Sequence, residues 1–173
     1  DGSKGLNDSG IKSSAISTDT AGDLLYKYDG ALYFKDNEDN SLHQIIDQWG
    51  GTPSFNWSDS GGSGDTAWSY AQEAYAVESF VDGSTKKFLL AIKNTDSWGG
   101  GSAETSWETF EIKLNASTSK WELDWDTGSY SKGIARKETV FGQDMNGSGG
   151  AAESASSIAT TLVATDVSRA GGL

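Results

Sequence analysis

Cysteine is absent from this chain of 173 residues, which also has only one histidine, one proline and one methionine. Without cysteine, a disulfide framework, a zinc–thiolate site and a thiol nucleophile are all excluded. A single imidazole also excludes most histidine-rich metal sites. Long apolar runs are missing as well, so we expect no membrane insertion. The length suits a single domain.

Basic residues are few, because 13 Lys and Arg stand against 25 Asp and Glu and give a formal net charge of −12. A chain this acidic, with no basic stripe, would be repelled by nucleic acid and by anionic lipid. Together with 22 glycines and seven tryptophans, the composition is typical of two settings. One is an ordinary cytosolic domain, and the other is a bacterial secreted or surface protein that uses calcium instead of disulfides for rigidity. The chain begins at Asp1 and not at Met, so we expect a processed product or a piece of something longer.

The two ends of the chain resemble each other. Residues 1–19 and 148–166, aligned without gaps, share Gly2/Gly149, Ser9/Ser156, Ile11/Ile158, Thr18/Thr165 and Asp19/Asp166. We therefore predict a tryptophan-rich β module over 1–149 and a tail over 150–173 that repeats the N-terminal segment. The tail would be the start of a next repeat or a segment donated to a neighbouring copy. Its candidate self-association residues are Ile158, Leu162, Val163 and Leu173.

Apolar and polar residues alternate along Lys86–Lys93, Phe110–Leu114 and Trp121–Trp125, as in strands with one buried face. Asp29-Gly30 and Asp82-Gly83 are signals for tight hairpin turns. Helix is expected only over 131–141 and 151–162, and both segments are short. The sequence therefore predicts an all-β fold, either an antiparallel β-sandwich or a barrel-like domain, with glycine-rich loops.

Several segments resemble the tryptophan-rich C-terminal domain family of cyanobacterial and marine bacterial surface and secreted proteins. The segments are Ile16–Leu25, Ile45–Gly51, Ala74–Glu78, Trp107–Phe110 and Glu138–Gly147. The last contains F-G-Q-D-x-N-G, the most specific part of the resemblance, which covers most of residues 16–149. The resemblance implies an extracellular β-rich module, often tandem and beside haemolysin-type calcium-binding repeats. It implies no catalytic residue.

The closing motif places side-chain oxygens at alternate positions, on Asp144, Asn146 and Ser148, before Gly149. Oxygens at positions one, three and five around a glycine-permitted turn are how an EF-hand-like loop surrounds Ca²⁺. The twelfth position is Ala155, where an EF-hand has a bidentate Glu, so binding would be weak. The alternative is a metal-free turn capped by its own Asp and Asn. Calcium is the only cofactor that we expect.

Trp49 and Trp98 share the pattern D-x-W-G-G, and each stands beside two glycines. One interpretation of this repeated pattern is that the chain contains two similar hairpin units, and the other is coincidence. An exposed indole ring would be a stacking platform for polysaccharide, and the two rings are our candidate ligand-binding residues. We favour the alternative, in which each ring folds back over the open end of the sheet and glycine lets the backbone approach.

Other polar residues are candidates with a simpler explanation. The acidic run over 36–40 could hold a cation, but an exposed loop is favoured. His43 lies among apolar residues and is interpreted as structural. Asp124 and Asp126 project from one strand face at a spacing that could serve a glycosidase. Charged residues opposite Trp121 and Trp125 are also what any half-buried strand has, and we favour that interpretation.

Three functions follow as hypotheses. The favoured one is an extracellular structural or adhesive module of a bacterial surface assembly, which associates head to tail with copies of itself or adjacent repeats through 150–173. The second is a glycan-binding adhesin module that uses Trp49 or Trp98. The third, a glycoside hydrolase using Asp124 and Asp126, is disfavoured, so we expect no enzyme. The expected location is secreted or at the bacterial cell surface.

Overall fold

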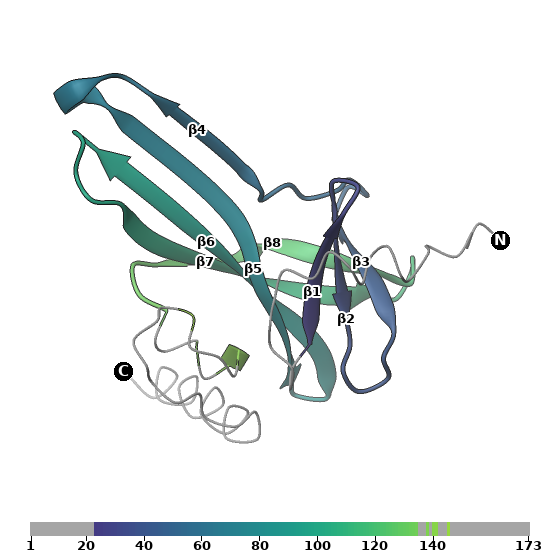
Figure 1. Ribbon diagram of the computed structural model, residues 1–173. Coiled ribbons are helices and arrows are strands. Elements are labelled where there is room, and N and C mark those ends of the chain that lie inside the picture. The colour runs from purple at the N-terminus through teal and green to yellow at the C-terminus, as the bar shows by residue number, and fades with distance from the viewer. Residues whose placement is uncertain (1–22, 135–137, 139, 142–144, 146–173) are drawn as a thin grey trace.

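The computed structural model describes residues 23–134 together with Glu138, Val140, Phe141 and Met145. Eight strands form one sheet in the order β1-β2-β3-β8-β7-β6-β5-β4. Their bounds are β1 Leu24–Tyr28, β2 Ala31–Lys35, β3 Leu42–Asp47, β4 Trp57–Gly61, β5 Trp68–Asp82, β6 Thr85–Trp98, β7 Glu104–Asn115 and β8 Lys120–Ser131. A 3₁₀ turn, η1, spans Gly64–Thr66. The sheet curls into a half-barrel, with the β1–β2 hairpin lying across β5 (Figure 1).

The predicted all-β, barrel-like fold is confirmed, and six of the seven described strand pairs are antiparallel. The exception is β3 with β8, which run parallel and place Ile45 opposite Trp121. The sheet is therefore mixed. The alternation of apolar residues fixes which face of a strand is buried, but it does not fix the direction of the neighbouring strand.

Both predicted hairpin turns are present. Tyr28 pairs with Ala31, and Asp29 and Gly30 between them have positive φ angles of 49° and 76°, as a type I′ turn requires. Asp82 pairs with Thr85, and Gly83 takes the first central position with φ 64°, as in a type II′ turn.

The main core fills the inside of the curl. Its buried residues come from every strand except β4, with Phe55 from the loop before β4. They are Leu25, Leu32, Phe34, Ile45, Phe55, Ala74, Val77, Phe88, Leu90, Ile92, Phe110, Ile112 and Leu123. Trp121 and Trp125 pack against them, as their alternation predicts. Leu114 was expected on the same buried face but is 51% exposed, because it lies past Ile112 toward the end of β7.

A second cluster covers the outside of the curl. Ala76, Ala91 and Trp107 of the sheet pack there with Ile134, Val140, Phe141 and Met145. Glu138, Val140 and Phe141 have helical backbone, in keeping with the short helix predicted over 131–141. Ser131 still belongs to β8, so that helix does not begin where the sequence placed it.

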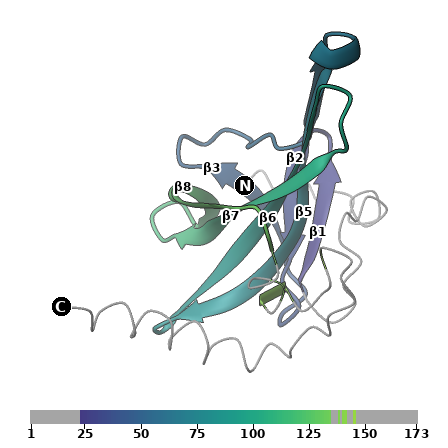
Figure 2. The same cartoon turned by 90° about the vertical axis from the view of Figure 1, so that its left-hand side faces the viewer.

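One end of the sheet projects from this body. β4, the first half of β5, the second half of β6 and the first residues of β7 rise to a tip formed by η1 and the Gly99–Ala103 loop (Figures 1 and 2). We call this projection the arm. Within the residues described, no helix has the length and apolar character needed to cross a membrane.

Candidate functional site

The strand register gathers aromatic and amide side chains on one face of the arm. Residues directly opposite each other in an antiparallel pair point to the same side of the sheet. Trp68 is opposite Gly61 and Trp98, and Gln72 is opposite Trp57 and Asn94. The positions sharing this side are Trp57, Asp59, Gly61, Trp68, Tyr70, Gln72, Asn94, Asp96, Trp98, Glu104, Ser106, Glu108 and Tyr130. We call them the arm face, and it continues the core side of the sheet beyond Ile92 and Phe110.

Four rings of the arm face form two pairs. The Trp57 and Tyr70 ring centroids are 4.9 Å apart, and those of Trp68 and Trp98 are 6.4 Å apart at 31°. Trp57 is 49% exposed and Trp98 is 70% exposed. A Cβ added to Gly61 would lie 3.0 Å from the Trp68 indole, so glycine is what lets this ring lie on β4. Each exposed indole therefore has a ring beside it.

A chain of hydrogen bonds runs beside the first ring pair. Trp57 Nε1 donates to Gln72 Oε1 at 3.2 Å, and Gln72 Nε2 donates to Asn94 Oδ1 at 3.0 Å. The Tyr70 hydroxyl donates to the same oxygen at 2.8 Å. Asn94 is buried, so its amide is fixed in place by these two bonds. The network holds amide groups in defined orientations next to a partly exposed ring, as pre-organised binding sites do.

Burial raises the pKa of Tyr70, and the carboxylates of Glu108 and Asp96 raise it further. The hydroxyl therefore stays protonated throughout the physiological range and keeps its role as a donor. The same effect shows that these two carboxylates act on the centre of the arm face.

The tip of the arm sets the position of the second ring pair. Gly62 has φ +71°, and a Cβ there would lie 2.0 Å from the Thr66 carbonyl oxygen. Across the tip, the Gly99 N–H donates to the Ala67 carbonyl at 2.8 Å, directly before Trp68 and after Trp98. A hollow of about 430 Å³ lies beside the Trp98 ring, and Asp96 and Glu104 are among its lining residues. The two glycine-rich turns thus hold both tryptophans at one end of the face.

Trp49 is exposed to 76% but stands alone. Asp47 Oδ1 accepts the N–H groups of Trp49 at 2.9 Å and Gly51 at 2.7 Å, which closes a tight turn after β3. The indole has no ring contact with any residue of the described ranges. The structure therefore does not bring Trp49 and Trp98 into a common arrangement.

Two interpretations of the D-x-W-G-G pattern are wrong. Neither Trp49 nor Trp98 folds back to cover the sheet, because both rings are largely exposed. The pattern does not mark two similar hairpins either, since β3 is followed by β4 at the far edge of the sheet, whereas β6 and β7 form a hairpin. Asp47 caps its own turn, while Asp96 is still paired within the strands.

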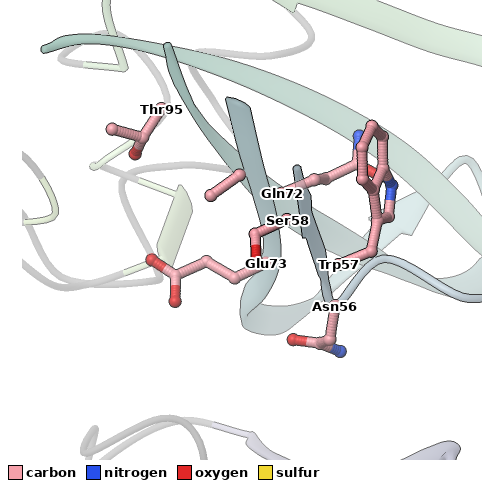
Figure 3. Close-up of a pocket in the computed structure, with 7 residues that line it drawn as sticks. Asn56, Trp57, Ser58, Gln72, Glu73 and Thr95 are labelled. Carbon is pink, nitrogen blue, oxygen red and sulfur yellow. The ribbon is translucent and has the colours of Figure 1, made fainter. Parts of the chain in front are cut away.

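The opposite side of the arm offers a weaker candidate. Figure 3 shows Glu73 and Thr95 on one side of the strands and the Trp57 indole and Gln72 on the other. A hollow of about 340 Å³ is lined by Asn56, Trp57, Ser58, Ala71, Gln72, Glu73 and Thr95. Among the described residues, Trp57 is the only aromatic one that lines it. We therefore take the arm face as the candidate site.

Of the two carboxylates suggested for a glycosidase, that of Asp124 has local partners. Lys113 Nζ donates to Asp124 Oδ2 at 2.5 Å, and this bond is the main cause of the lowered pKa of Asp124. The N–H of Asp126 donates to Asp124 Oδ1 at 3.2 Å, and the Asp126 side chain is exposed. A carboxyl group held ionised in this way is poorly suited to act as a general acid.

The other polar candidates have structural roles. His43 Nε2 lies 2.5 Å from the Ser41 hydroxyl, and its ring packs between Phe34 and Trp121. Residues 36–40 form the loop between β2 and β3, where Asp36 binds Lys86 through both carboxylate oxygens at 2.8 and 2.7 Å. The placement of His43 agrees with the interpretation favoured from the sequence, and residues 37–40 are exposed as expected, whereas Asp36 is buried.

The predicted calcium ligands Asp144, Asn146 and Ser148 and the self-association residues Ile158, Leu162, Val163 and Leu173 lie outside the described residues. Met145 of the same motif is described: it is buried, and its N–H donates to Glu138 Oε1 at 3.0 Å. Among the described residues, no group of three or more acidic or histidine side chains could hold a metal. The calcium motif and the tail remain predictions.

Comparisons of this chain with protein-family models, curated proteins and solved structures give no match. The resemblance to the tryptophan-rich C-terminal domain family therefore stays a prediction.

Proposed function

We propose that this domain binds polysaccharide through the arm face. The observation that carries the proposal is the pair of exposed indoles, Trp57 and Trp98, each supported by a second ring. The faces of aromatic rings suit the apolar faces of pyranose rings, while sugar hydroxyls need fixed donors and acceptors at the rim. The partly exposed Gln72 amide, which buried Asn94 holds in place, is such a group on the same side of the sheet.

Exposure of these rings to water favours a ligand over a purely architectural role. Exposed aromatic rings that are fixed in place and bordered by polar groups are typical of binding sites. Trp57 and Trp98 lie on a projecting arm, apart from the buried core residues. The setting we propose is the bacterial cell surface or the medium, where an acidic, cysteine-free module meets polysaccharides. This setting rests on composition and on the family resemblance.

Trp98→Ala and Trp49→Ala form a matched pair for testing the proposal. Both remove an indole that is largely exposed, but only Trp98 has a partner ring and lies on the arm face. In titrations against a polysaccharide panel, followed by tryptophan fluorescence, we expect Trp98→Ala to weaken binding about tenfold or more, which corresponds to roughly 1.4 kcal/mol. Trp49→Ala should bind as the wild type does.

Stability is the control for this comparison. Substitutions at exposed positions usually change the free energy of unfolding by less than about 0.5 kcal/mol, so both variants should unfold close to the wild type. Equal binding by the two variants would contradict the assignment of the arm face, and a wild-type protein that binds no member of the panel would overturn the proposal.

Self-association is a second candidate, favoured by one feature of the sheet. β1 and β4 are its two end strands, so each has a neighbouring strand on one side only within the described residues. Such edges accept an added strand from another chain. We propose that residues 150–173 of a neighbouring copy supply it, with Ile158 and Leu162 among its apolar contacts. Deleting residues 158–173 should leave a monomer in light scattering, and assembly that persists after the deletion would overturn this candidate.

A further inference from the structure

The arm face carries four carboxylates and no cation. Asp59, Asp96, Glu104 and Glu108 all point to the side of the sheet that bears the paired rings. None of the 13 positions of the arm face is Lys or Arg. Lys93 lies in the same part of β6 but points to the opposite side, where its Nζ is 3.5 Å from Glu73 and 5.5 Å from the Tyr75 ring centroid. The binding surface is therefore negative throughout.

These charges reach the centre of the aromatic surface. Asp96 is opposite Tyr70 and Glu104, and Glu108 is opposite Tyr130. Besides burial, the carboxylates of both Glu108 and Asp96 raise the pKa of Tyr70, which belongs to the first ring pair. An anionic group on a ligand would have to approach the rings through this field. In an acidic chain of net charge −12, no distant excess of positive charge offsets it.

The two ring pairs are also spread along the strands. Trp57 lies beside the Gln72–Asn94 end of the face, and Trp98 is four residues further along β6 than Asn94. Four residues of strand span about 13 Å. A single sugar ring cannot cover both exposed indoles, Trp57 and Trp98, whereas an extended chain of several sugars can.

From these observations we infer that the arm face selects uncharged polysaccharide chains of several sugar units and excludes those that carry carboxylate or sulfate groups. This inference rests on the proposed function, since it names the ligand class of the same site. The rings and amide groups supply attraction that does not depend on ligand charge, and the carboxylates supply repulsion that acts only on anionic polymers.

Polymers that share a backbone but differ in charge test the inference directly. We would titrate the whole chain with hydroxyethyl cellulose and carboxymethyl cellulose, and with dextran and dextran sulfate, following tryptophan fluorescence. We expect the neutral member of a pair to bind at least tenfold more tightly at low salt. The gap should narrow at high salt, because the screening length falls from about 30 Å at 0.01 M to about 3 Å at 1 M. A length series of neutral oligosaccharides should bind more tightly once the chain spans both ring pairs.

A variant of the arm face that keeps only one of its four carboxylates is the second test of the inference. The triple change Asp96→Asn, Glu104→Gln and Glu108→Gln keeps the side-chain shapes and removes three negative charges. We expect it to bind the anionic polymers about tenfold more tightly than the wild type, so that its ratio of neutral to anionic affinity falls. Glu73→Gln, on the opposite side of the arm, is the matched control and should change neither affinity.

The possible results distinguish failure of this inference from failure of the proposed polysaccharide binding. Wild-type protein that binds neutral and anionic polymers equally, or binds a monosaccharide as well as a long oligosaccharide, overturns the inference and leaves polysaccharide binding standing. Protein that binds neither member of any pair overturns both. Fluorescence that changes with protein concentration alone and is abolished by Trp98→Ala would assign the arm face to a second copy of the chain and would also overturn both.

Discussion

Asp23 links the β1–β2 hairpin to β5 by hydrogen bonds, and we expect its removal to lower the free energy of unfolding more than most changes to a polar side chain in this domain. The residue directly precedes β1 and is 2% exposed. Its Oδ1 accepts the N–H of Asn37 in the loop after β2 at 2.7 Å, and its Oδ2 accepts the N–H of Ser79 on β5 at 2.7 Å. One carboxylate thus joins three segments that are distant in sequence, at the place where the sheet curls.

The cost of losing these bonds follows from their type. A hydrogen bond to a charged group contributes about 1.5–3 kcal/mol, and two such bonds give an upper value of roughly 6 kcal/mol. Water can reach the partly buried N–H groups once the carboxylate is gone, so we expect Asp23→Ala to lower the free energy of unfolding by about 3 kcal/mol. Asp23→Asn keeps one acceptor oxygen and should lose about 2 kcal/mol.

Urea unfolding followed by tryptophan fluorescence measures this directly. For a chain of this length, 3 kcal/mol corresponds to a fall of roughly 6–12 °C in the melting temperature. Asp126→Ala removes an exposed carboxylate and serves as the control, with an expected change below about 0.5 kcal/mol. If Asp23→Ala unfolds at the same urea concentration as Asp126→Ala, the Asp23 carboxylate does not hold these three segments together.

Three further predictions concern pH, the tip of the arm and calcium. Burial lowers the pKa of His43 below 6.5, so the unfolded chain binds a proton that the folded chain does not. Stability should be full above about pH 6.5 and fall as the pH drops toward the folded pKa, and His43→Gln should flatten that part of a urea-midpoint profile. Gly62→Ala should disrupt the tip of the arm and abolish polysaccharide binding, because the added Cβ would lie 2.0 Å from the Thr66 carbonyl oxygen. Gly64→Ala is the control: Gly64 has φ +56° but open space around it, so this change should lower the free energy of unfolding by only about 1 kcal/mol and retain binding. Excess chelator should lower the melting temperature if the Asp144 motif holds Ca²⁺, and Asp144→Asn should remove this effect; a melting curve unchanged by chelator contradicts the calcium prediction.

The hairpins and the buried strand faces could be predicted because their causes are local. Asp29-Gly30 supplies the positive φ angles of a tight turn, and alternation along Lys86–Lys93 places Phe88, Leu90 and Ile92 in the core. The parallel pairing of β3 with β8 has no local cause. It depends on the chain forming β4 to β7 and returning beside β3, which no pattern within either strand encodes.

Trp98 could be singled out from the sequence, but its environment could not. Trp49 lies in the same D-x-W-G-G pattern and is also exposed. The difference is that β3 ends at Asp47, whose carboxylate is then free to close the turn, whereas β6 continues through Asp96 with a strand on either side. The same D-x-W-G-G pattern therefore has a different environment at its two positions, because the neighbouring strands differ. Tyr70, Gln72 and Asn94 were not predicted as site residues for the same reason, since only the strand pairing brings them together.

The arm face depends on a β-bulge in the pairing of β5 with β6. Between the Asp82-Gly83 turn and the core, paired residues of β5 and β6 follow the register that places Ala76 opposite Ala91, but beyond the bulge Ala74 is opposite Ile92, and Tyr75 is the extra residue. Continuing the hairpin register without the bulge would place Trp98 opposite Ser69, on the other side of the sheet from Trp68. Because a shift of one residue moves every side chain to the opposite face, the bulge is what brings the tryptophans and the amide network together. Tyr75 packs edge-on against Trp107 at 5.0 Å, so the extra residue has its contact on the outer side of the sheet, while the register that it creates forms the proposed binding face on the inner side.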